Sequence, residues 1–304
     1  MTKVLVVGSA GYVGQRLMRV LKTRPGVEAV GADIRTGPGL ADLRLDLAFP
    51  AQSFGLVHQV KPDVLIELAY MLSAPIEADP QRGIETNIVG INGLFEASVK
   101  LGVPRVLFAS SGSVYGAQSI YGDREVDETE PLPPARTLYQ LHKQFSERMI
   151  EHYNSTQKTT RFVILRISSP HGRGKQSSDF NPLDRLVQAV VAGQKSIAVP
   201  WTKDRPVSFN HVDDCAEICA TLALAPSPRW DVYNLGGEAL STEQLARIAS
   251  DKFGLEVKHK EGSAPATFMG KISSKRLDDE FKFRRGSAAE WFAREVAEAK
   301  GGAA

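Results

Sequence analysis

The sequence has few cysteines, no long apolar run and no excess of charge of one sign. Only Cys215 and Cys219 are present among 304 residues, which excludes a disulfide framework. Their spacing places both on one face of a predicted helix, where a disulfide between them is geometrically poor. We therefore expect two core-facing thiols rather than metal ligands, and no metal site is predicted.

No stretch approaches the roughly 20 apolar residues that a membrane span needs. The four apolar residues that follow Lys3 are too few for a signal peptide. The net charge is 37 − 35 = +2, which provides no basic field for nucleic acid or an anionic membrane. These absences predict a soluble, cytoplasmic protein that acts on a small molecule.

Short runs of apolar and β-branched residues alternate with longer segments of helical periodicity. Strands are predicted at residues 4–7, 27–32, 64–68, 106–110, 162–165 and 232–235. Helices are predicted at residues 12–21, 52–60, 82–101, 139–153 and 212–224. This alternation predicts an α/β fold with a parallel sheet covered by helices. From Ser168 to Asp184 the chain is rich in Ser, Gly, Pro and Lys, and from Leu240 onward it is helical and charged, which predicts a second, smaller lobe. The last residues, Gly301 to Ala304, are expected to form a frayed tail.

Glycines punctuate the turn after the first predicted strand, at Gly8, Gly11 and Gly14. Glycine lets the backbone approach a pyrophosphate, and the N–H groups at the start of the next helix stabilise its charge. A glycine trio alone is weak evidence, because a plain strand-to-helix turn without a ligand can also carry it. Asp33 follows Gly14 by 19 positions, close to the spacing of about 20 expected for a carboxylate that binds the adenosine ribose. Together these features predict a dinucleotide site.

Asp33 also bears on the choice of coenzyme. A carboxylate repels the 2′-phosphate of NADP and accepts a hydrogen bond from the free hydroxyl of NAD. Arg35 is the counter-evidence, because it could bend toward a phosphate. NAD is favoured over NADP.

Tyr139 and Lys143 are four residues apart in a predicted helix and therefore share a face. A phenol with a pKa of about 10 is a poor base at pH 7. A neighbouring ammonium and the positive nicotinamide ring of oxidised NAD would lower that pKa and make the phenol a usable acid and base at an alcohol or carbonyl. Ser111, near the end of the fourth strand, would donate a hydrogen bond to the same oxygen. This spacing also occurs by chance in many helices, so its weight depends on the dinucleotide turn.

These motifs make the sequence resemble the extended short-chain dehydrogenase/reductase family, also called the NAD-dependent epimerase/dehydratase family, over nearly the whole chain. The resemblance implies that Ser111, Tyr139 and Lys143 are catalytic. The implied cofactor contacts are Gly8, Gly11, Tyr12, Val13, Gly14, Asp33, Asp46, Leu47, Ala69, Asn87, Tyr139 and Lys143. No nucleic-acid partner is implied.

The resemblance also implies a domain plan and an assembly. Residues 1–167 would form an NAD-binding Rossmann domain with a doubly wound parallel sheet, to which residues 206–236 return. Residues 168–205 and 237–304 would form a smaller C-terminal substrate-binding lobe. A homodimer would pair the helices at residues 82–101 and 139–153.

Several positions depart from the patterns of this family. Gly112 and Ser113 stand where sugar-nucleotide 4,6-dehydratases carry an acidic pair, which argues against dehydration. Ser168 to His171 replace a segment in which sugar-nucleotide epimerases have an asparagine that contacts the diphosphate, which weakens a nucleotide-sugar substrate. Glu67 replaces the usual histidine after the third strand, and we expect a solvated or capped carboxylate there.

The predicted function is NAD-dependent hydride transfer to or from a small polar hydroxyl or keto substrate, with Tyr139 as acid and base. Resemblance to the threonine 3-dehydrogenase branch, at Asp33 to Arg35, Met71 to Ala74 and Asp213 to Cys215, favours this function. One alternative is a nucleotide-sugar epimerase that retains NAD. Another is a catalytically silent NAD(P)-responsive regulator.

The remaining polar and aromatic candidates concern the substrate and the surface. Ser113, His171 and Arg205 are predicted substrate contacts, and Arg205 could bind a phosphate or a carboxylate. His211 is expected near the cleft. His142 is expected to be a surface or dimer-contact histidine, and Trp201 a lid or packing aromatic. The candidate residues therefore fall into a coenzyme set, a catalytic set and a less defined substrate set.

Overall fold

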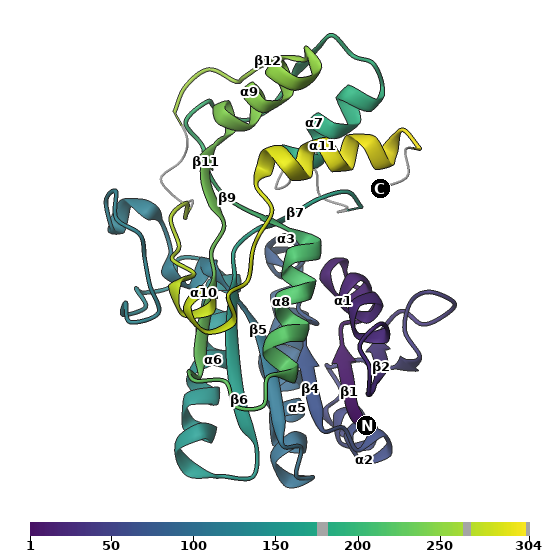
Figure 1. Cartoon of the computed structure of the whole chain (residues 1–304). Helices are drawn as coiled ribbons and strands as arrows, with labels where there is room; N and C mark the ends of the chain where they lie inside the picture. The colour runs from purple at the N-terminus through teal and green to yellow at the C-terminus, as the bar shows by residue number, and fades with distance from the viewer. Residues whose placement is uncertain (175–181, 264–268, 302–304) are drawn as a thin grey trace. The chain divides into compact units, whose positions relative to one another are not determined.

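The computed structural model shown in Figure 1 describes residues 1–174, 182–263 and 269–301. The chain forms two compact units. The first comprises Met1–Val114, Pro131–Arg166 and Ala216–Tyr233, and the second comprises Tyr115–Glu130, Ile167–Cys215 and Asn234–Ala304. Residues 175–181 of the Ser-, Gly- and Pro-rich segment and residues 302–304 of the predicted tail lie outside the described residues.

The main sheet has seven strands in the order β10-β6-β5-β4-β1-β2-β3. These strands are β1 (Thr2–Val7), β2 (Val27–Asp33), β3 (Leu43–Arg44), β4 (Val64–Glu67), β5 (Arg105–Ser111), β6 (Arg161–Ile167) and β10 (Val232–Leu235). From β1 the chain adds β2 and β3 on one side and β4, β5, β6 and β10 on the other. The strand order reverses between β1 and β4, and open α/β sheets bind ligands at the carboxyl ends of the strands at such a point.

Helices flank this sheet on both sides (Figure 1), which confirms the predicted doubly wound α/β fold. The helices of the first unit are α1 (Tyr12–Lys22), α2 (Pro50–Val60), α3 (Ser73–Ala78), α4 (Pro80–Ile84), the π-helical η1 (Glu85–Gly90), α5 (Ile91–Lys100), α6 (Leu138–Thr156) and most of α8 (Val212–Leu224). The predicted single helix at residues 82–101 is therefore three consecutive helices. Apolar side chains of β1, β4, β5 and β6 pack with those of α2 and α5 in one core, which makes the strand ends a rigid platform for a site.

The second unit contains two small sheets, with strand orders β11-β9-β7 and β12-β8. Their strands are β7 (Pro170–His171), β8 (Ser196–Ala198), β9 (Pro206–His211), β11 (Glu238–Ser241) and β12 (Glu256–Lys258). Helices α7 (Pro182–Val191), α9 (Thr242–Phe253), α10 (Lys275–Phe281) and α11 (Ala288–Ala299) and the short 3₁₀ turns η2 (Gly112–Tyr115) and η3 (Gln118–Ile120) complete the described elements. α7, α9 and α11 pack around a core of their own.

The compact units differ from the predicted domain plan at residue 167 and residues 234–236, next to the predicted boundaries, and in two longer segments. Residues 206–215 belong to the second unit, because β9 pairs with β7 and β11 rather than with the main sheet. Tyr115–Glu130 also belongs to the second unit, because Val126 forms a bridge with Ile272 and exchanges backbone hydrogen bonds with the chain around it. Both pairings involve short strands or turns, whose sequences are too short to show a strand pattern. The sequence therefore did not predict either pairing.

Cys215 and Cys219 are buried free thiols, as predicted. Among the described residues, no helix is long and apolar enough to span a membrane. No group of three or more His, Cys, Asp or Glu side chains in the described part of the chain is arranged to hold a metal ion.

Candidate active site

The glycine turn between β1 and α1 allows two close approaches of the backbone. Gly8 has a φ of +87°, and a Cβ there would lie 2.6 Å from the backbone nitrogen of Ala69. A Cβ at Gly14 would lie 2.1 Å from the carbonyl oxygen of Gly8. Only glycine fits both positions. Gly11 is the N-cap of α1, so no side chain caps the first N–H groups of the helix, and this arrangement fits a pyrophosphate.

Asp33 ends β2 with its carboxylate against the glycine turn. Its Oδ2 accepts a hydrogen bond from the backbone nitrogen of Ala10 at 3.1 Å, and its Oδ1 accepts one from the backbone nitrogen of Arg35 at 3.0 Å. The guanidinium of Arg35 donates to the carbonyl oxygen of Ala10 at 2.6 Å and is largely exposed. The two side chains that bear on the choice between NAD and NADP therefore lie together at one edge of the turn.

The segment at Asp46 and Leu47 is held against the π-helical turn η1 and the helix before it. Both carboxylate oxygens of Asp46 accept hydrogen bonds from Nη2 of Arg82, at 2.8 and 2.7 Å. A Cβ at Gly90 would lie 2.2 Å from the carbonyl oxygen of Leu47, so this contact also requires glycine. An ion pair thus fixes the Asp46 carboxylate, which the resemblance to the family assigns to the adenine.

Asn87 holds the chain segment that follows β4. Its side chain is buried, accepts a hydrogen bond from the backbone nitrogen of Met71 at 2.9 Å and donates to the carbonyl oxygen of Met71 at 3.0 Å. Asn87 lies in η1, and single π-helical turns inside longer helices often occur at functional sites. The helical interruption therefore positions the segment that leads from Ala69 to Met71.

Helix α6 carries Tyr139 and Lys143, and its orientation is fixed at two places. Thr137 caps the helix by accepting a hydrogen bond from the backbone nitrogen of Gln140 at 3.1 Å. Further along, the buried Glu147 accepts hydrogen bonds from Nε of Arg166 at 3.0 Å, from Nη2 of Arg166 at 2.7 Å and from the hydroxyl of Ser110. α6 is therefore tied to β5 and β6.

The hydroxyl groups of Ser111 and Tyr139 interact at the carboxyl end of β5. Hydrogen bonding with Ser111 acts to lower the pKa of Tyr139. The Oγ of Ser111 also accepts a hydrogen bond from the backbone nitrogen of Ser113 at 3.2 Å. The buried hydroxyl of Ser113 has no hydrogen-bond partner within the described ranges. The hydroxyl groups of Ser111, Ser113 and Tyr139 therefore lie near the same end of β5.

Lys143 is buried, with 3% of its surface exposed. Its Nζ donates a hydrogen bond to the carbonyl oxygen of Ala109 at 2.6 Å and lies 3.4 Å from the centroid of the Tyr70 ring. A ring face stabilises an ammonium at such a distance. Burial lowers the pKa of Lys143 to about 7, whereas the charges of Glu67 and Glu147 act to raise it. Lys143 is therefore a buried group whose charge depends on its neighbours.

The protein's own groups raise the pKa of Tyr139, and its lowering by a bound nicotinamide ring stays a prediction. Burial raises the pKa of Tyr139 to about 12, the charge of Glu67 raises it further, and only Ser111 opposes these effects. Helical spacing places Tyr139 and Lys143 on one face, but the ammonium is directed at Ala109 and Tyr70. Tertiary contacts rather than helical spacing therefore decide where the positive charge lies.

The expectation of a solvated or capped carboxylate at Glu67 is wrong. Glu67 ends β4, and its side chain is fully buried. Neither carboxylate oxygen has a hydrogen-bond partner of normal geometry among the residues described, although the nearby amide of Ala69 acts to lower its pKa. Burial outweighs this amide and the charge of Lys143, and raises the pKa of Glu67 to about 8. β4 lies between β1 and β5, so its last residue is covered on both sides.

His142 is also buried, in contrast to the predicted surface or dimer-contact position. Its Nδ1 lies 3.5 Å from Nδ2 of Asn87, and burial lowers its pKa. The reason is that α6 packs against α3 and η1, which cover this side of the helix. Sequence alone places His142 on a different face from Tyr139 but does not show that this face is covered.

Two predicted substrate contacts, His171 and Arg205, belong to the second unit. The ring of His171 is buried and stacks on that of Phe209, with centroids 5.2 Å apart. Arg205 is half-buried, and its carbonyl oxygen accepts a hydrogen bond from the backbone nitrogen of Thr242 at 3.0 Å. Their role in binding a substrate stays a prediction.

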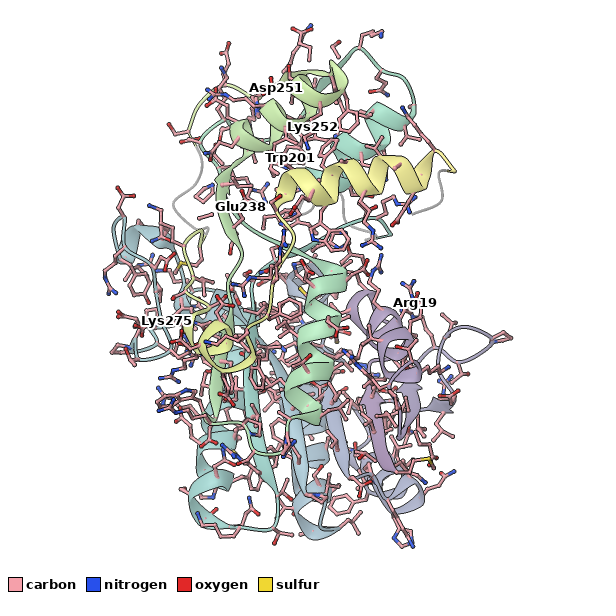
Figure 2. All side chains as sticks on the ribbon, in the orientation of Figure 1. Arg19, Trp201, Glu238, Asp251, Lys252 and Lys275 are labelled. Carbon is pink, nitrogen blue, oxygen red and sulfur yellow. The ribbon has the colours of Figure 1, made fainter. Side chains whose placement is uncertain are left out.

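His211 and Trp201 have structural partners in the second unit. Nε2 of His211 lies 2.8 Å from Oε1 of Glu295, and its ring stacks on Trp291 with centroids 3.6 Å apart. Trp201, labelled in Figure 2, is buried in the core of this unit, which confirms that it is a packing aromatic. These contacts hold the two side chains in place.

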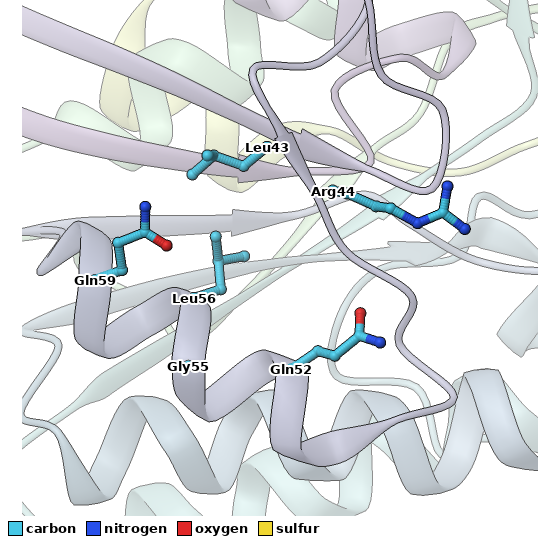
Figure 3. Close-up of a pocket in the computed structure, with 6 residues that line it drawn as sticks. All are labelled: Leu43, Arg44, Gln52, Gly55, Leu56 and Gln59. Atoms are coloured by element: carbon cyan, nitrogen blue, oxygen red, sulfur yellow. The ribbon is translucent and has the colours of Figure 1, made fainter.

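A surface hollow of about 380 Å³ lies between β3 and α2 (Figure 3). It is lined by Leu43, Arg44, Gln52, Gly55, Leu56 and Gln59. None of the predicted catalytic or coenzyme residues lines it. The hollow is therefore separate from the candidate site.

The fold and these residues define a dinucleotide-binding α/β protein with a serine, a tyrosine and a lysine at the strand ends. A model of the NAD dependent epimerase/dehydratase family matches residues 4–236. The chain belongs to this family, which confirms the resemblance seen in the sequence. It is accordingly an NAD-dependent enzyme.

Comparisons with individual proteins show several activities among its relatives. The chain is 31% identical to D-erythronate dehydrogenase of Cupriavidus necator over 169 residues, 50% of each protein. It is 25% identical to GDP-6-deoxy-D-talose 4-dehydrogenase of Aggregatibacter actinomycetemcomitans over 218 residues, 71% of this chain and 68% of the relative. UDP-glucose 4-epimerase of Thermus thermophilus, solved as a complex with NAD, has the same fold, with a TM-score of 0.83, 22% identity and 99% of each chain covered.

Proposed function

We propose that the chain transfers a hydride between NAD and a small polar alcohol or ketone, with Tyr139 as the acid and base. The observation that carries this proposal is the placement of the short segment from Leu68 to Tyr70. At one end its backbone contacts the glycine turn at Gly8, and at its other end the Tyr70 ring contacts Tyr139 and Lys143. The coenzyme turn and the catalytic helix therefore meet on a single stretch of chain.

The proposed reaction divides the work between the coenzyme and the chain. When bound, NAD supplies the acceptor or donor of the hydride. In the direction of oxidation, the Tyr139 oxygen takes the proton of the substrate hydroxyl as the carbon loses its hydride. Ser111 donates a hydrogen bond to the same substrate oxygen and holds it in place. Lys143 lies against the ring of Tyr70, which contacts Tyr139, and in its charged form it would favour the phenolate.

The glycine turn, Asp33 and the Asp46–Leu47 segment would hold the coenzyme. The uncapped start of α1 would bind the pyrophosphate, and Asp33 would accept hydrogen bonds from the adenosine ribose in place of the amide of Ala10. This carboxylate supports NAD over NADP, although Arg35 lies beside it.

A small substrate is supported by two observations. The segment from Ser168 to His171 lacks the asparagine that epimerases use for a diphosphate, and the relative with 31% identity is a D-erythronate dehydrogenase. A nucleotide-sugar epimerase is the second candidate. The likeness to a GDP-sugar dehydrogenase favours a nucleotide-sugar substrate, and 24% identity over 281 residues to UDP-glucose 4-epimerase of Lacticaseibacillus casei favours epimerisation. The alternative of a silent regulator is weakened by the presence of Ser111, Tyr139 and Lys143.

The deciding experiment measures turnover and bound coenzyme in the purified protein. We expect the protein to be isolated without NAD and to reduce added NAD with short hydroxy acids or polyols. Tyr139→Phe should lower kcat by about 100-fold or more and leave the affinity for NAD unchanged. Tyr153→Phe removes a hydroxyl of the same helix, which donates to Asn92, and should retain turnover.

Other outcomes would select the alternatives. NAD that stays bound through purification, with epimerisation of a nucleotide sugar, would replace this proposal by the epimerase. A protein that binds NAD but shows no turnover, and whose properties Tyr139→Phe does not change, would be a regulator.

We further propose that the chain forms a homodimer in the cytoplasm. Apolar side chains of α4, η1 and α6 are exposed in the first unit, namely Ile84, Val89, Leu141 and Phe145. A second copy covering α6 and the helices from α4 to α5 would bury them. The free thiols at Cys215 and Cys219 support a reducing compartment.

A further inference from the structure

Tyr70 lies between two residues whose backbones are fixed. The backbone of Ala69, before it, makes the close approach to Gly8. The backbone of Met71, after it, exchanges two hydrogen bonds with the side chain of Asn87. The Tyr70 ring also packs against the core of the first unit. These contacts hold the ring at a defined place just beyond the carboxyl end of β4.

The ring of Tyr70 contacts both members of the catalytic pair on α6. Nζ of Lys143 lies 3.4 Å from the centroid of this ring. The ring of Tyr139 meets it almost at a right angle, with an interplanar angle of 87° and centroids 5.7 Å apart. A single ring therefore touches both the lysine and the tyrosine to which the proposed mechanism assigns the proton transfer.

The direct contacts of the Lys143 ammonium are neutral groups. Its Nζ donates a hydrogen bond to the carbonyl oxygen of Ala109 at 2.6 Å and lies 4.6 Å from the centroid of the Phe108 ring. The side chain is almost completely buried, so water contributes little to its solvation. The face of an aromatic ring carries partial negative charge and attracts a cation, and this attraction is stronger when the cation is desolvated.

Two carboxylates near Lys143, from β4 and α6, do not replace these contacts. Glu147 of α6 is neutralised by Arg166 of β6. Burial raises the pKa of Glu67 to about 8, so this carboxyl group of β4 is largely protonated at the pH at which Lys143 is charged. Among the described residues, neither carboxylate forms an ion pair with Lys143. Of the two rings that the ammonium approaches, that of Tyr70 is the nearer.

We propose that Tyr70 is a positioning residue whose ring holds the Lys143 ammonium beside Tyr139 and keeps it charged in the buried site. The inference rests on the proposed function of this pair. Burial raises the pKa of Tyr70, so its phenol stays neutral where Lys143 titrates. Its hydroxyl has no hydrogen-bond partner of normal geometry among the residues described, although the nearby hydroxyl of Ser146 acts on its pKa. The ring rather than the hydroxyl therefore carries the role.

The first measurement varies the charge on the ring face at nearly constant shape. Tyr70→Phe and its mono-, di- and trifluorinated counterparts are made by nonsense suppression, and each fluorine weakens the attraction of the ring for a cation. NMR of protein labelled with ε-¹³C-lysine reports the titration of Lys143, whose signal is identified by its loss in Lys143→Met. The titration midpoint should fall stepwise along the series, by about half a pH unit or more in total.

The matched control is the same fluorine series at Tyr153, another tyrosine that packs in the first unit. Tyr153 stacks on Phe162, and no lysine or arginine faces its ring within the described ranges. Fluorination there should leave the titration midpoint of Lys143 unchanged. A stepwise shift that occurs at Tyr70 alone is the signature of an ammonium held by that ring, because a purely structural role does not depend on the number of fluorines.

The second measurement is turnover. Tyr70→Leu removes the ring and should lower kcat about tenfold, whereas Tyr70→Phe restores the ring and should recover most of the wild-type kcat. The affinity for NAD should change less than kcat in Tyr70→Leu, because Ala69 approaches Gly8 through its backbone.

Three results would decide against one or other claim. A midpoint that stays constant along the fluorine series at Tyr70 would show that the ring does not hold the ammonium, and the inference would be wrong. Equal losses of kcat in Tyr70→Phe and Tyr70→Leu would also contradict it, because they would trace the effect to the hydroxyl. If the midpoint shifts but the wild-type protein has no turnover, the proposed function fails and the role of Tyr70 in holding Lys143 stands.

Discussion

Glu147 and Arg166 form a buried ion pair in which both carboxylate oxygens accept hydrogen bonds from one guanidinium. The pair joins α6 to β6, and the hydroxyl of Ser110 of β5 donates a further hydrogen bond to Glu147. It therefore fixes the helix on which Tyr139 and Lys143 lie. The geometry of the catalytic pair depends on this contact, which lies one turn of helix beyond Lys143.

Removing one partner of this ion pair should destabilise the protein strongly. Arg166→Met leaves the Glu147 charge buried without its cation, which costs about 3–5 kcal/mol in the free energy of unfolding. Urea unfolding measures the change. The exposed pair between Arg148 and Glu151 on the same helix is the control, and Arg148→Met should cost less than about 1 kcal/mol. Equal losses of unfolding free energy in the two variants would contradict the claim that the Glu147–Arg166 pair fixes α6.

Gly14→Ala should impair NAD binding. Its Cβ would lie 2.1 Å from the carbonyl oxygen of Gly8, so the turn that cradles the pyrophosphate must shift. We expect the affinity for NAD, measured by calorimetry, to fall at least about tenfold, equivalent to about 1.4 kcal/mol. Gly55→Ala in α2 is the control because no atom lies within 4 Å of its added Cβ, and it should be neutral or stabilising by up to about 1 kcal/mol. An unchanged affinity in Gly14→Ala would place the coenzyme elsewhere.

Asp33→Ser should shift the coenzyme preference toward NADP. The substitution removes the carboxylate that repels a 2′-phosphate, while Arg35 remains available for it. The ratio of kcat/KM for NAD over that for NADP should fall at least about tenfold. In the double variant Asp33→Ser with Arg35→Ala, the increase in kcat/KM for NADP should disappear. An unchanged ratio would show that Asp33 does not face the ribose.

Glu67 and Lys143 should give the free energy of unfolding a minimum between about pH 7 and 8. The pKa of Glu67 is raised in the folded state, so its stabilising contribution is complete below its unfolded pKa of 4.5 and is lost as the pH rises through about 8. The pKa of Lys143 is lowered, so its contribution is complete above 10.5 and is lost as the pH falls through about 7. Unfolding at pH 5, 7.5 and 10 measures both effects. In Glu67→Gln the loss of stability between pH 5 and 7.5 should be smaller, and an identical loss would mean that Glu67 does not titrate in this range.

Phe145→Asp should dissociate the proposed dimer. The substitution places a charge on the exposed apolar face of α6, where a second copy would bury it without a partner. Sedimentation should show an increase of at least about 100-fold in the dimer dissociation constant. Ile120→Asp changes another exposed apolar residue, which belongs to the second unit, and should leave the assembly unchanged. A wild-type protein that sediments as a monomer would exclude the dimer.

Local patterns in the sequence were sufficient for much of the first unit. Apolar strands, helical periodicity and glycine spacing depend on neighbouring residues, so the six predicted strands are all found in the main sheet, within one or two residues. The four-residue spacing of Cys215 and Cys219 likewise predicted that both thiols face the core. Local patterns did not predict the π-helical turn at Asn87 or the pairing of β9 in the second unit. Both features depend on contacts with residues that are distant in the sequence.

The sequence by itself determined the α/β fold, the family and the residue types that can bind a coenzyme and move a proton. Only the tertiary structure decided the charge state of these groups. The burial of Glu67, the contacts of Lys143 and the raised pKa of Tyr139 arise where β4, β5 and α6 meet. Ionisation depends on the solvent and charges that surround a group in three dimensions, and helical spacing alone carries no information on either.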